Sequence, residues 1–384
     1  MTESSWQLNG HQVKYVADDA AFKTAVNQLA RQPALALDLE FDDNRYTYGL
    51  TLCLIQIADE HTCFLIDPFR VRDLQPLWDI IADPAVMKII HSASNDILLL
   101  KKLGCQPRNI LDTELAAKML DYARTSFANM MAMVLKVDID KAYQVSNWNT
   151  RPLVAEQLLY AANDVVYLHP LKDNLLGHIR ELDRLSWLEE ECRLLEMIEQ
   201  KDQADRYQKL RGADRLTCFE LFVLKQMYDY REKLAYQLNK PSGSVIPNEV
   251  LVNMAAEPVL QFSDWQSTKG MMGRIKDHQN FKDFRNVILQ AQEQARQENI
   301  PHTRPTRPRR PDFLVTREEA EKRKARLLPV RSHLAALYGE NVATILLPQG
   351  VVNEYAEGKP LEIRKNYARQ IVSTVLSELA ISLD

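Results

Sequence analysis

Between residues 34 and 92 the chain consists of short apolar segments separated by polar turns, a pattern typical of neighbouring β-strands. The strand-like segments are ALALDLEF (34–41), TLCLIQIAD (51–59), TCFLIDP (62–68) and VMKIIHS (86–92). The later ones are almost continuously apolar, which predicts burial on both faces of one sheet. A helix (LQPLWDII) precedes the last strand, and helical spacing follows at 96–103, 113–120 and 128–135. The pattern therefore predicts an α/β layer.

Beyond residue 150 the pattern becomes helical. A long helix is predicted to begin near Pro152, because proline is favoured in a first turn, and to run toward Pro170. Helical spacing continues to about residue 203. After Arg206 the segments LTCFELFVLKQMYDYREKLAYQLN and NEVLVNMAAEP, separated by a turn at KPSG, predict a compact domain made of helices alone.

The segment 296–314 interrupts this helical pattern. Prolines alternate there with arginines, a composition that cannot hold a regular helix, so we expect a basic linker. Helical spacing returns at 317–338 and 361–383, on either side of LLPQGVVNEYAEG. The predicted organisation is an α/β domain at 1–200, a helical domain at 206–295, a linker at 296–314 and a second helical domain at 315–384.

Composition and charge limit the kind of protein this can be. The composition, 46% hydrophobic and 26% charged, is that of a folded protein. A length of 384 residues predicts more than one domain. No apolar run approaches the length of a membrane span and the N-terminus lacks a signal-peptide layout, so we expect a cytoplasmic protein. The net charge of −4 argues against coating of nucleic acid by bulk electrostatics. Any contact with nucleic acid must come from local basic patches or from metal ions.

The cysteines are scattered and show no zinc-ligand spacing, so buried free thiols are expected. They are Cys53, Cys63, Cys105, Cys192 and Cys218.

Carboxylates mark the ends of two of the predicted strands. Asp38 and Glu40 are two residues apart at the end of the first strand, so both side chains point to the same side. Asp96 follows the last strand at the start of a helix, and Tyr160 and Asp164 share one face of the later helix. Each feature alone has an ordinary explanation: a solvated turn, a carboxylate favoured by the helix dipole, or a surface pair. Only their combination points to chemistry.

In this order the three motifs resemble those of the DEDD exonuclease superfamily and, within it, the ribonuclease D family. The segments DLEFDDNRYTYGLTLCLIQIAD, HSASNDILLL, ILDTELAAKML and SNWNTRPLVAEQLLYAANDVVYLHPL also resemble ribonuclease D segments. Leu39 departs from the family, which often carries a small or hydroxyl residue at this place. Tyr160 places the chain with the tyrosine subclass, and His91, five residues before Asp96, is interpreted as structural.

The resemblance implies a metal-dependent 3′→5′ exoribonuclease. Two divalent cations, Mg²⁺ or Mn²⁺, are implied, because these ions prefer hard oxygen ligands. The implied metal ligands are Asp38, Glu40, Asp96 and Asp164. By the same resemblance Asp38 contributes to both ions and Tyr160 orients the attacking water. RNA 3′ ends, as in tRNA precursors, are the implied substrates and nucleoside 5′-monophosphates the products, and neither an obligate protein partner nor a membrane attachment is expected.

Residues after the first motif are candidates for substrate contact, because aromatic rings stack on bases and arginine meets phosphate. They are Phe41, Arg45, Tyr46 and Tyr48. A polar loop with two packed tyrosines is the alternative. Trp148, before the last motif, is interpreted as a packing anchor.

The segment MYDYREKLAYQLNKPSGSVIPNEVLVNMAAEPV resembles the helicase and RNase D C-terminal (HRDC) domain. The fold class implied is therefore α/β, with a ribonuclease H-like mixed-sheet exonuclease domain followed by all-α HRDC-type helical domains. Such domains often contact nucleic acid, and the first helices offer Lys225, Arg231, Lys233 and Lys240 for this. A 3′→5′ DNA exonuclease and a catalytically inactive nucleic-acid-binding scaffold remain the alternative functions, although none of the four carboxylates is missing.

Overall fold

The computed structural model describes residues 5–140, 142–199, 205–305 and 315–383, which form two compact units. The first unit takes its residues from 1–40, 52–200 and 310–384, and the second from 41–51 and 201–309. The end of the helical pattern expected near residue 203 lies outside the described residues. The same holds for residues 306–314 of the predicted linker, with Arg307, Arg309 and Arg310.

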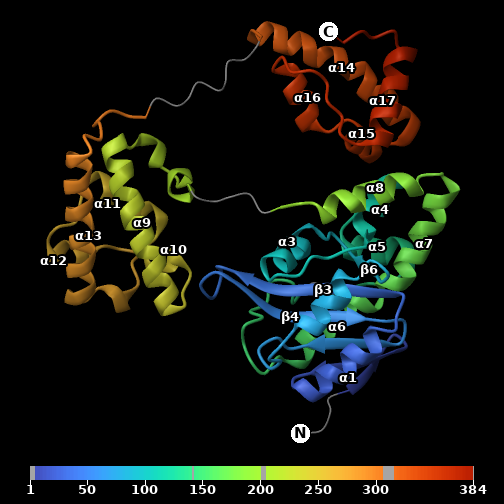
Figure 1. Ribbon diagram of the computed structural model, residues 1–384, viewed down its shortest axis with the longest axis horizontal. Helices are drawn as coiled ribbons and strands as arrows, with labels where there is room; N and C mark the ends of the chain where they lie inside the picture. The colour runs from blue at the N-terminus through green and yellow to red at the C-terminus, as the bar shows by residue number, and fades with distance from the viewer. Residues whose placement is uncertain (1–4, 141, 200–204, 306–314, 384) are drawn as a thin grey trace. The chain divides into compact units, whose positions relative to one another are not determined.

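A seven-stranded sheet forms the centre of the first unit, with the strand order β1-β2-β5-β4-β3-β6-β7 (Figure 1). The strands are β1 (Ser5–Leu8), β2 (His11–Val16), β3 (Ala34–Asp43), β4 (Leu50–Ala58), β5 (Thr62–Ile66), β6 (Met87–Ile90) and β7 (Ile110–Asp112). The sheet is mixed, because β3, β6 and β7 run parallel while β5 is antiparallel to β4. The prediction of four neighbouring strands is confirmed by β3 to β6, and every residue of β5 is buried.

Helices pack around this sheet, and the α/β layer expected from the sequence is confirmed. They are α1 (Asp19–Leu29), α2 (Gln75–Ala82), α3 (Ser94–Lys102), α4 (Thr113–Met119), α5 (Phe127–Met130), α6 (Ala155–Val166), α7 (Leu168–Glu181) and α8 (Leu185–Glu196). A π-helical turn, Met131–Leu135, continues α5. Among the five cysteines, four are buried and Cys218 is half-buried, all as free thiols.

The helix predicted to begin near Pro152 differs from the prediction at both ends. It begins at Ala155, and Pro152 belongs to the preceding turn, where its peptide bond with Arg151 is cis. It also ends at Val166 instead of continuing toward Pro170, and α7 begins at Leu168. Pro170 has no backbone N–H to donate to the carbonyl four residues earlier, which is that of Val166. The missing hydrogen bond accounts for the break between α6 and α7.

The second unit contains a bundle of helices with its own core around Trp265 and Phe284. Its helices are α9 (Cys218–Leu238), α10 (Ser242–Val245), α11 (Asn248–Ala256), α12 (Phe262–Ser267) and α13 (His278–Gln297), with 3₁₀ turns at Arg206–Lys209, Ala213–Arg215 and Gly273–Ile275. Thr217 caps α9 by accepting the backbone N–H of Glu220, and its own backbone N–H donates to the Glu220 carboxylate. After α13 the described start of the predicted linker is ordered, because the carbonyls of Pro301 and Thr303 accept hydrogen bonds from the first residues of α9.

Arg231 of α9, predicted to be available for nucleic acid, is buried. Its guanidinium donates to the carbonyl of Ile246 and to the side chain of Asn248, so it holds the bundle together. Lys225, Lys233 and Lys240 remain exposed.

The C-terminal helices belong to the first unit. They are α14 (Arg317–Tyr338), α15 (Glu340–Leu346), α16 (Gln349–Ala356) and α17 (Asn366–Glu378). The helix predicted at 317–338 is confirmed, whereas the one expected at 361–383 is shorter and the segment before it is also helical. Leu334 and Val372 share one hydrophobic cluster with Leu188 of α8. Among the residues that the structure describes, no helix has the length and apolar character needed to cross a bilayer.

Candidate active site

Strand β3 changes its pattern of burial where the first two carboxylates lie. Its first half is buried on both faces, as at Leu35 and Ala36, which are fully buried. From Leu37 onward the side chains alternate, with Leu37 and Leu39 in the core and Asp38 and Glu40 partly exposed. Because alternate side chains of a strand share a face, both carboxylates project to the same side of the sheet, as predicted.

Asp96 reaches the same end of the sheet from the neighbouring strand. Strand β6 pairs in parallel with β3, and the chain turns after Ile90 and enters α3 at Ser94. Asp96 lies in the first turn of α3 and is buried. The prediction that Asp96 stands near a helix start after a strand is confirmed.

The third motif lies on α6, which packs against β5. Tyr160 and Asp164 are one turn apart, so they share a helix face. The ring of Tyr160 packs on the buried Trp148, with 6.1 Å between ring centroids. Trp148 is thus a packing residue, as predicted.

The structure brings the carboxylates of the first and third motifs together. Oxygen atoms of Asp38, Glu40 and Asp164 all lie within 4.8 Å of one another. Asp96 is not a member of this close group, but its negative charge acts on Glu40. Three acidic side chains from β3 and α6 therefore surround one small volume, and α3 brings Asp96 near enough for its charge to act on Glu40.

Burial and mutual repulsion make these carboxylates unusually hard to ionise. Burial raises the pKa of Asp38 to about 7. Burial and then the charge of Asp38 raise the pKa of Asp96 and that of Asp164 well above their ordinary values. Glu40 responds in the same way, because burial and the three aspartate charges raise its pKa.

This donor set fits a divalent cation. Carboxylate oxygens are hard ligands of the kind that Mg²⁺ and Mn²⁺ prefer, and the groups are close enough to share an ion. A bound cation would also relieve the repulsion that raises these pKa values. The close group contains three of the four carboxylates that the sequence marks as metal ligands.

Tyr160 remains a hydrogen-bond donor in this environment. Burial, the charges of Asp164 and Glu40 and a hydrogen bond with Asp164 raise the pKa of Tyr160 far above its ordinary value. The phenol therefore keeps its proton at any physiological pH.

Of the four residues predicted to contact substrate, Phe41 lies on β3 and the other three lie in the turn between β3 and β4, and Phe41–Thr51 belong to the second unit. Asp42 closes the hairpin by accepting hydrogen bonds from the backbone N–H groups of Arg45 and Tyr46. Within the second unit, the hydroxyl of Tyr48 donates to Glu232 over 3.2 Å. The contacts of Tyr48 are those of a packed tyrosine, and a substrate role for Phe41, Arg45, Tyr46 and Tyr48 stays a proposal.

Arg151 lies just before α6 and has a structural role that its neighbours in the sequence do not predict. Its guanidinium forms a bidentate ion pair with the carboxylate of Asp67, with N–O distances of 2.7 and 3.0 Å. It also donates to the carbonyls of Cys53 and Trp148. These bonds fix the turn that leads into α6. The sequence around Arg151 does not predict this ion pair, because its partner Asp67 lies 84 positions away.

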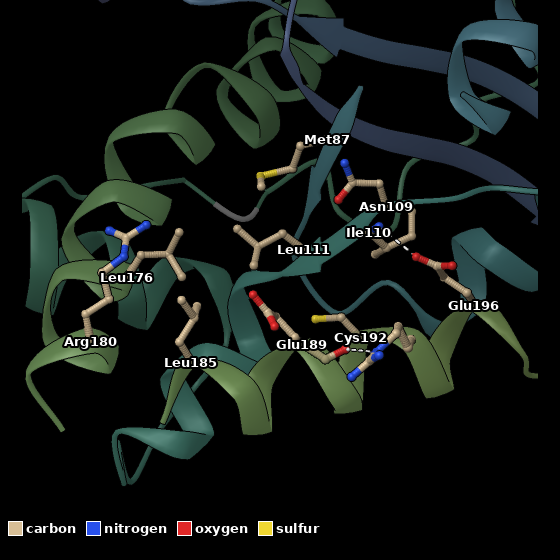
Figure 2. Close-up of a pocket in the computed structure, with 11 residues that line it drawn as sticks. Met87, Asn109, Ile110, Leu111, Leu176, Arg180, Leu185, Glu189, Cys192 and Glu196 are labelled. Carbon is tan, nitrogen blue, oxygen red and sulfur yellow. Dashed lines mark hydrogen bonds between the residues drawn. The ribbon is translucent and has the colours of Figure 1, made fainter. Parts of the chain in front are cut away.

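A pocket of about 370 Å³ lies elsewhere in the first unit, between the strands β6 and β7 and the helices α7 and α8 (Figure 2). Its lining includes Met87, Leu111, Arg180 and Glu189. Met87 begins β6, whereas Asp96 follows the end of that strand. None of the residues of the three motifs lines this pocket, so it is not the site of the carboxylates.

Comparison with known proteins agrees with this geometry. A family model described as a 3′-5′ exonuclease matches residues 13–180. Ribonuclease D of Desulfotalea psychrophila is 37% identical over 240 residues, which cover 61% of this chain and 64% of that protein. The matched part of the chain thus spans slightly less than two thirds of this relative. Ribonuclease D of Zymomonas mobilis is 30% identical over 295 residues, covering 74% of each chain.

The fold is also found among solved structures. The structure of Escherichia coli RNase D, described as an exoribonuclease involved in structured RNA processing, is similar with a TM-score of 0.70. The two sequences are 24% identical, and the similarity covers 95% of this chain and 98% of that one. The likeness in fold therefore covers nearly the whole chain, both the mixed sheet and the helices that follow it.

Proposed function

Because the chain belongs to the ribonuclease D family, we propose that it is a metal-dependent 3′→5′ exoribonuclease that shortens RNA one nucleotide at a time. The observation that carries the proposal is the convergence of Asp38, Glu40 and Asp164, whose oxygens lie within 4.8 Å of one another. Asp96 adds a fourth charge from the neighbouring strand end. A structural role does not explain why a folded chain keeps four repelling carboxylates together.

The carboxylates are proposed to hold two divalent cations, Mg²⁺ or Mn²⁺. When bound, such ions activate a water molecule and stabilise the departing oxygen. The chain's own contribution is placement: β3 fixes two ligands on one face, α3 supplies Asp96, and α6 supplies Asp164. The protonated phenol of Tyr160 is proposed to hydrogen-bond the attacking water and hold it in line with the phosphorus.

The proposed reaction is hydrolysis of the last phosphodiester bond. The water oxygen bonds to phosphorus, and the bond from phosphorus to the 3′ oxygen of the preceding nucleotide breaks. That 3′ oxygen takes up a proton, and the proton lost by the water passes to solvent. The released nucleotide keeps its phosphate, so the product is a nucleoside 5′-monophosphate.

The test compares RNA and DNA of the same sequence, each with a label near the 5′ end, in the presence of Mg²⁺ or Mn²⁺. We expect a ladder that shortens by single nucleotides on RNA and stops when the metal is chelated. Asp38→Ala and Asp164→Ala should abolish it. Degradation of DNA alone would favour a DNA exonuclease, and no degradation of either would favour an inactive scaffold. Full activity in Asp38→Ala would reject the assignment of the site.

Structured RNAs such as tRNA precursors are the proposed substrates. Family membership supports this choice, as does the presence of a separate helical bundle with exposed lysines. Trimming a tRNA precursor with a short 3′ extension should stop near the end of the folded acceptor stem. An unstructured RNA with the same 3′ sequence should be shortened without such a stop, and shortening of the tRNA precursor through its acceptor stem, with no stop, would argue against a structured substrate.

A further inference from the structure

One buried carboxylate that is not among the predicted site residues connects two segments of the chain near that site. Asp112 ends β7 and is 2% exposed. It also caps α4, because its Oδ1 accepts hydrogen bonds from the backbone N–H groups of Glu114, at 2.8 Å, and Leu115, at 3.3 Å. A capping aspartate is common at such a position and requires no further role.

The same carboxylate also binds the turn between β6 and α3. Oδ1 accepts the N–H of Ser92 at 3.0 Å, and Oδ2 accepts the N–H of Ala93 at 2.9 Å. Both oxygens are therefore used, and four backbone N–H groups from two segments converge on Asp112. Capping of α4 alone would not need the bonds to Ser92 and Ala93.

The turn held in this way leads directly into the helix that carries Asp96. Ser92 has φ of +65°, a left-handed conformation that costs a non-glycine residue free energy. The carbonyl of the next residue, Ala93, accepts the N–H of Ile97 at 3.0 Å and so closes the first turn of α3. Asp96 lies within that turn. Its position thus depends on a strained backbone that Asp112 fixes from the neighbouring strand.

We propose that Asp112 is a positioning residue for Asp96, which sets the distance of the Asp96 carboxylate from the other three. This inference rests on the proposed role of Asp96 as a metal ligand. Asp112 makes these hydrogen bonds to backbone groups, so its structural effect on the site passes through the turn at 92–93, and its negative charge in addition raises the pKa of Asp96. An asparagine at position 112 has only one acceptor oxygen. Its NH₂ group would take the place of the other carboxylate oxygen and face a backbone N–H of the turn at 92–93, so that hydrogen bond would be lost. A serine can still cap α4 but is too short to reach that turn.

The test uses Asp112→Asn and Asp112→Ser in the full chain. We expect Mn²⁺ binding, measured directly by calorimetry, to weaken about ten- to a hundredfold, as is typical when a residue that orients a metal ligand is lost. Turnover should fall with it, while the KM for RNA stays unchanged. Asp112→Ser keeps the cap of α4 and serves if Asp112→Asn does not fold.

Asp59→Asn is the matched control. Asp59 is also a buried aspartate in a turn, where Oδ1 accepts the N–H groups of His61 and Thr62, but it follows the far end of β4. We expect it to lower the melting temperature without changing Mn²⁺ binding. Wild-type Mn²⁺ binding in a folded Asp112 variant would overturn the inference. Asp96→Ala, measured in parallel, separates a failure of the Asp112 inference from a failure of the proposed metal site. Wild-type Mn²⁺ binding in Asp96→Ala would reject Asp96 as a ligand.

Discussion

At the scale of single residues, we expect the carboxylates of the site to exchange a proton for a cation. In the folded chain without a cation, the pKa of Asp38 is about 7, compared with an ordinary value of 3.8. The same direction holds for Glu40, Asp96 and Asp164. Each group is therefore easier to ionise in the unfolded chain than in the folded one, and folding at neutral pH works against the repulsion that metal binding would remove.

Metal binding should therefore stabilise the chain more at high pH than at low pH. The pKa of Asp38 is higher in the folded chain than in the unfolded chain. The protonated form of Asp38 therefore favours folding, and this contribution to stability is fully present below pH 4 and is lost as pH rises through 7. Mn²⁺ replaces the proton, and the rise in melting temperature on adding Mn²⁺ should be larger at pH 8 than at pH 5.5. Thermal unfolding at both pH values measures this.

Asp38→Asn provides the control for that prediction. The amide carries no charge, so the metal-free variant should be more stable than wild type at pH 8 and respond much less to Mn²⁺. An equal Mn²⁺ response of wild type at both pH values would contradict the exchange of protons for cations.

Tyr160→Phe should separate chemistry from folding. The phenylalanine ring keeps the contact with Trp148, and only the hydroxyl is lost. We expect turnover to fall roughly a hundredfold, a typical loss for a group that handles the reacting water. The melting temperature and Mn²⁺ affinity should stay close to wild type. A fall in Mn²⁺ affinity as large as the fall in turnover would assign Tyr160 to metal binding instead.

At the scale of elements, the central strands could be predicted and the outer ones could not. Strands β3, β4 and β5 are long or mostly apolar, and β6 lies within the apolar segment VMKIIHS between turn residues, so the sequence pattern shows all four. Strand β7 has only three residues, too few to establish a period, and β1 is exposed or half-buried along its length. The end of α6 depends on one missing backbone donor at Pro170, which affects the chain four residues earlier.

The candidate site follows the same division. Asp38 and Glu40 could be placed on one face because strand geometry fixes that relation locally. Asp112 could not, because its partners Ser92 and Ala93 lie about twenty positions earlier and are backbone groups without a sequence signal. Sequence motifs name side chains that act directly, whereas residues that position them are visible only in the folded chain.

Strand β6 hides a lysine inside its apolar run, which gives a further prediction. Lys88 is fully buried and its Nζ donates to the carbonyls of Asp83 and Val86. Burial lowers the pKa of Lys88 to about 8 from 10.5, so between these values the unfolded chain binds more protons and stability rises with pH. Lys88→Met removes this effect. Urea unfolding should therefore show wild type gaining on the variant between pH 7.5 and 9.5.

Lys23→Met is the matched control for Lys88, because Lys23 is exposed on α1. Its stability relative to wild type should not change over the same interval. Parallel pH curves for wild type and Lys88→Met would show that the buried lysine does not titrate differently on folding.

At the scale of the whole molecule, the C-terminal helices are tied into the first unit. Tyr367 donates to the buried Glu191 and stacks on Trp187, with 5.2 Å between ring centroids. Asp121 accepts the N–H of Asn341 at 2.7 Å. A separate domain is predicted from residue 315 onward, because helical spacing shows where helices begin but not which core they share.

Gly339, between α14 and α15, should be essential to this junction. Its φ of +97° and ψ of 162° suit only glycine, and an added Cβ would lie 2.1 Å from the carboxylate of Asp121. We expect Gly339→Ala to cost at least about 1–3 kcal/mol, which corresponds to roughly 2–4 °C in melting temperature per kcal/mol. Thermal unfolding and limited proteolysis of the full chain measure the loss.

The cost of Gly339→Ala has two parts, and a double substitution separates them. Asp121→Ala removes the atoms that an added Cβ would meet but leaves the backbone strain, so Gly339→Ala should cost less in that background. Gly350→Ala, in the first turn of α16 with open space around it, is the matched control and should be neutral or slightly stabilising. Equal costs of Gly339→Ala with and without Asp121 would mean that the close approach to Asp121 contributes nothing and that the cost comes from backbone strain alone.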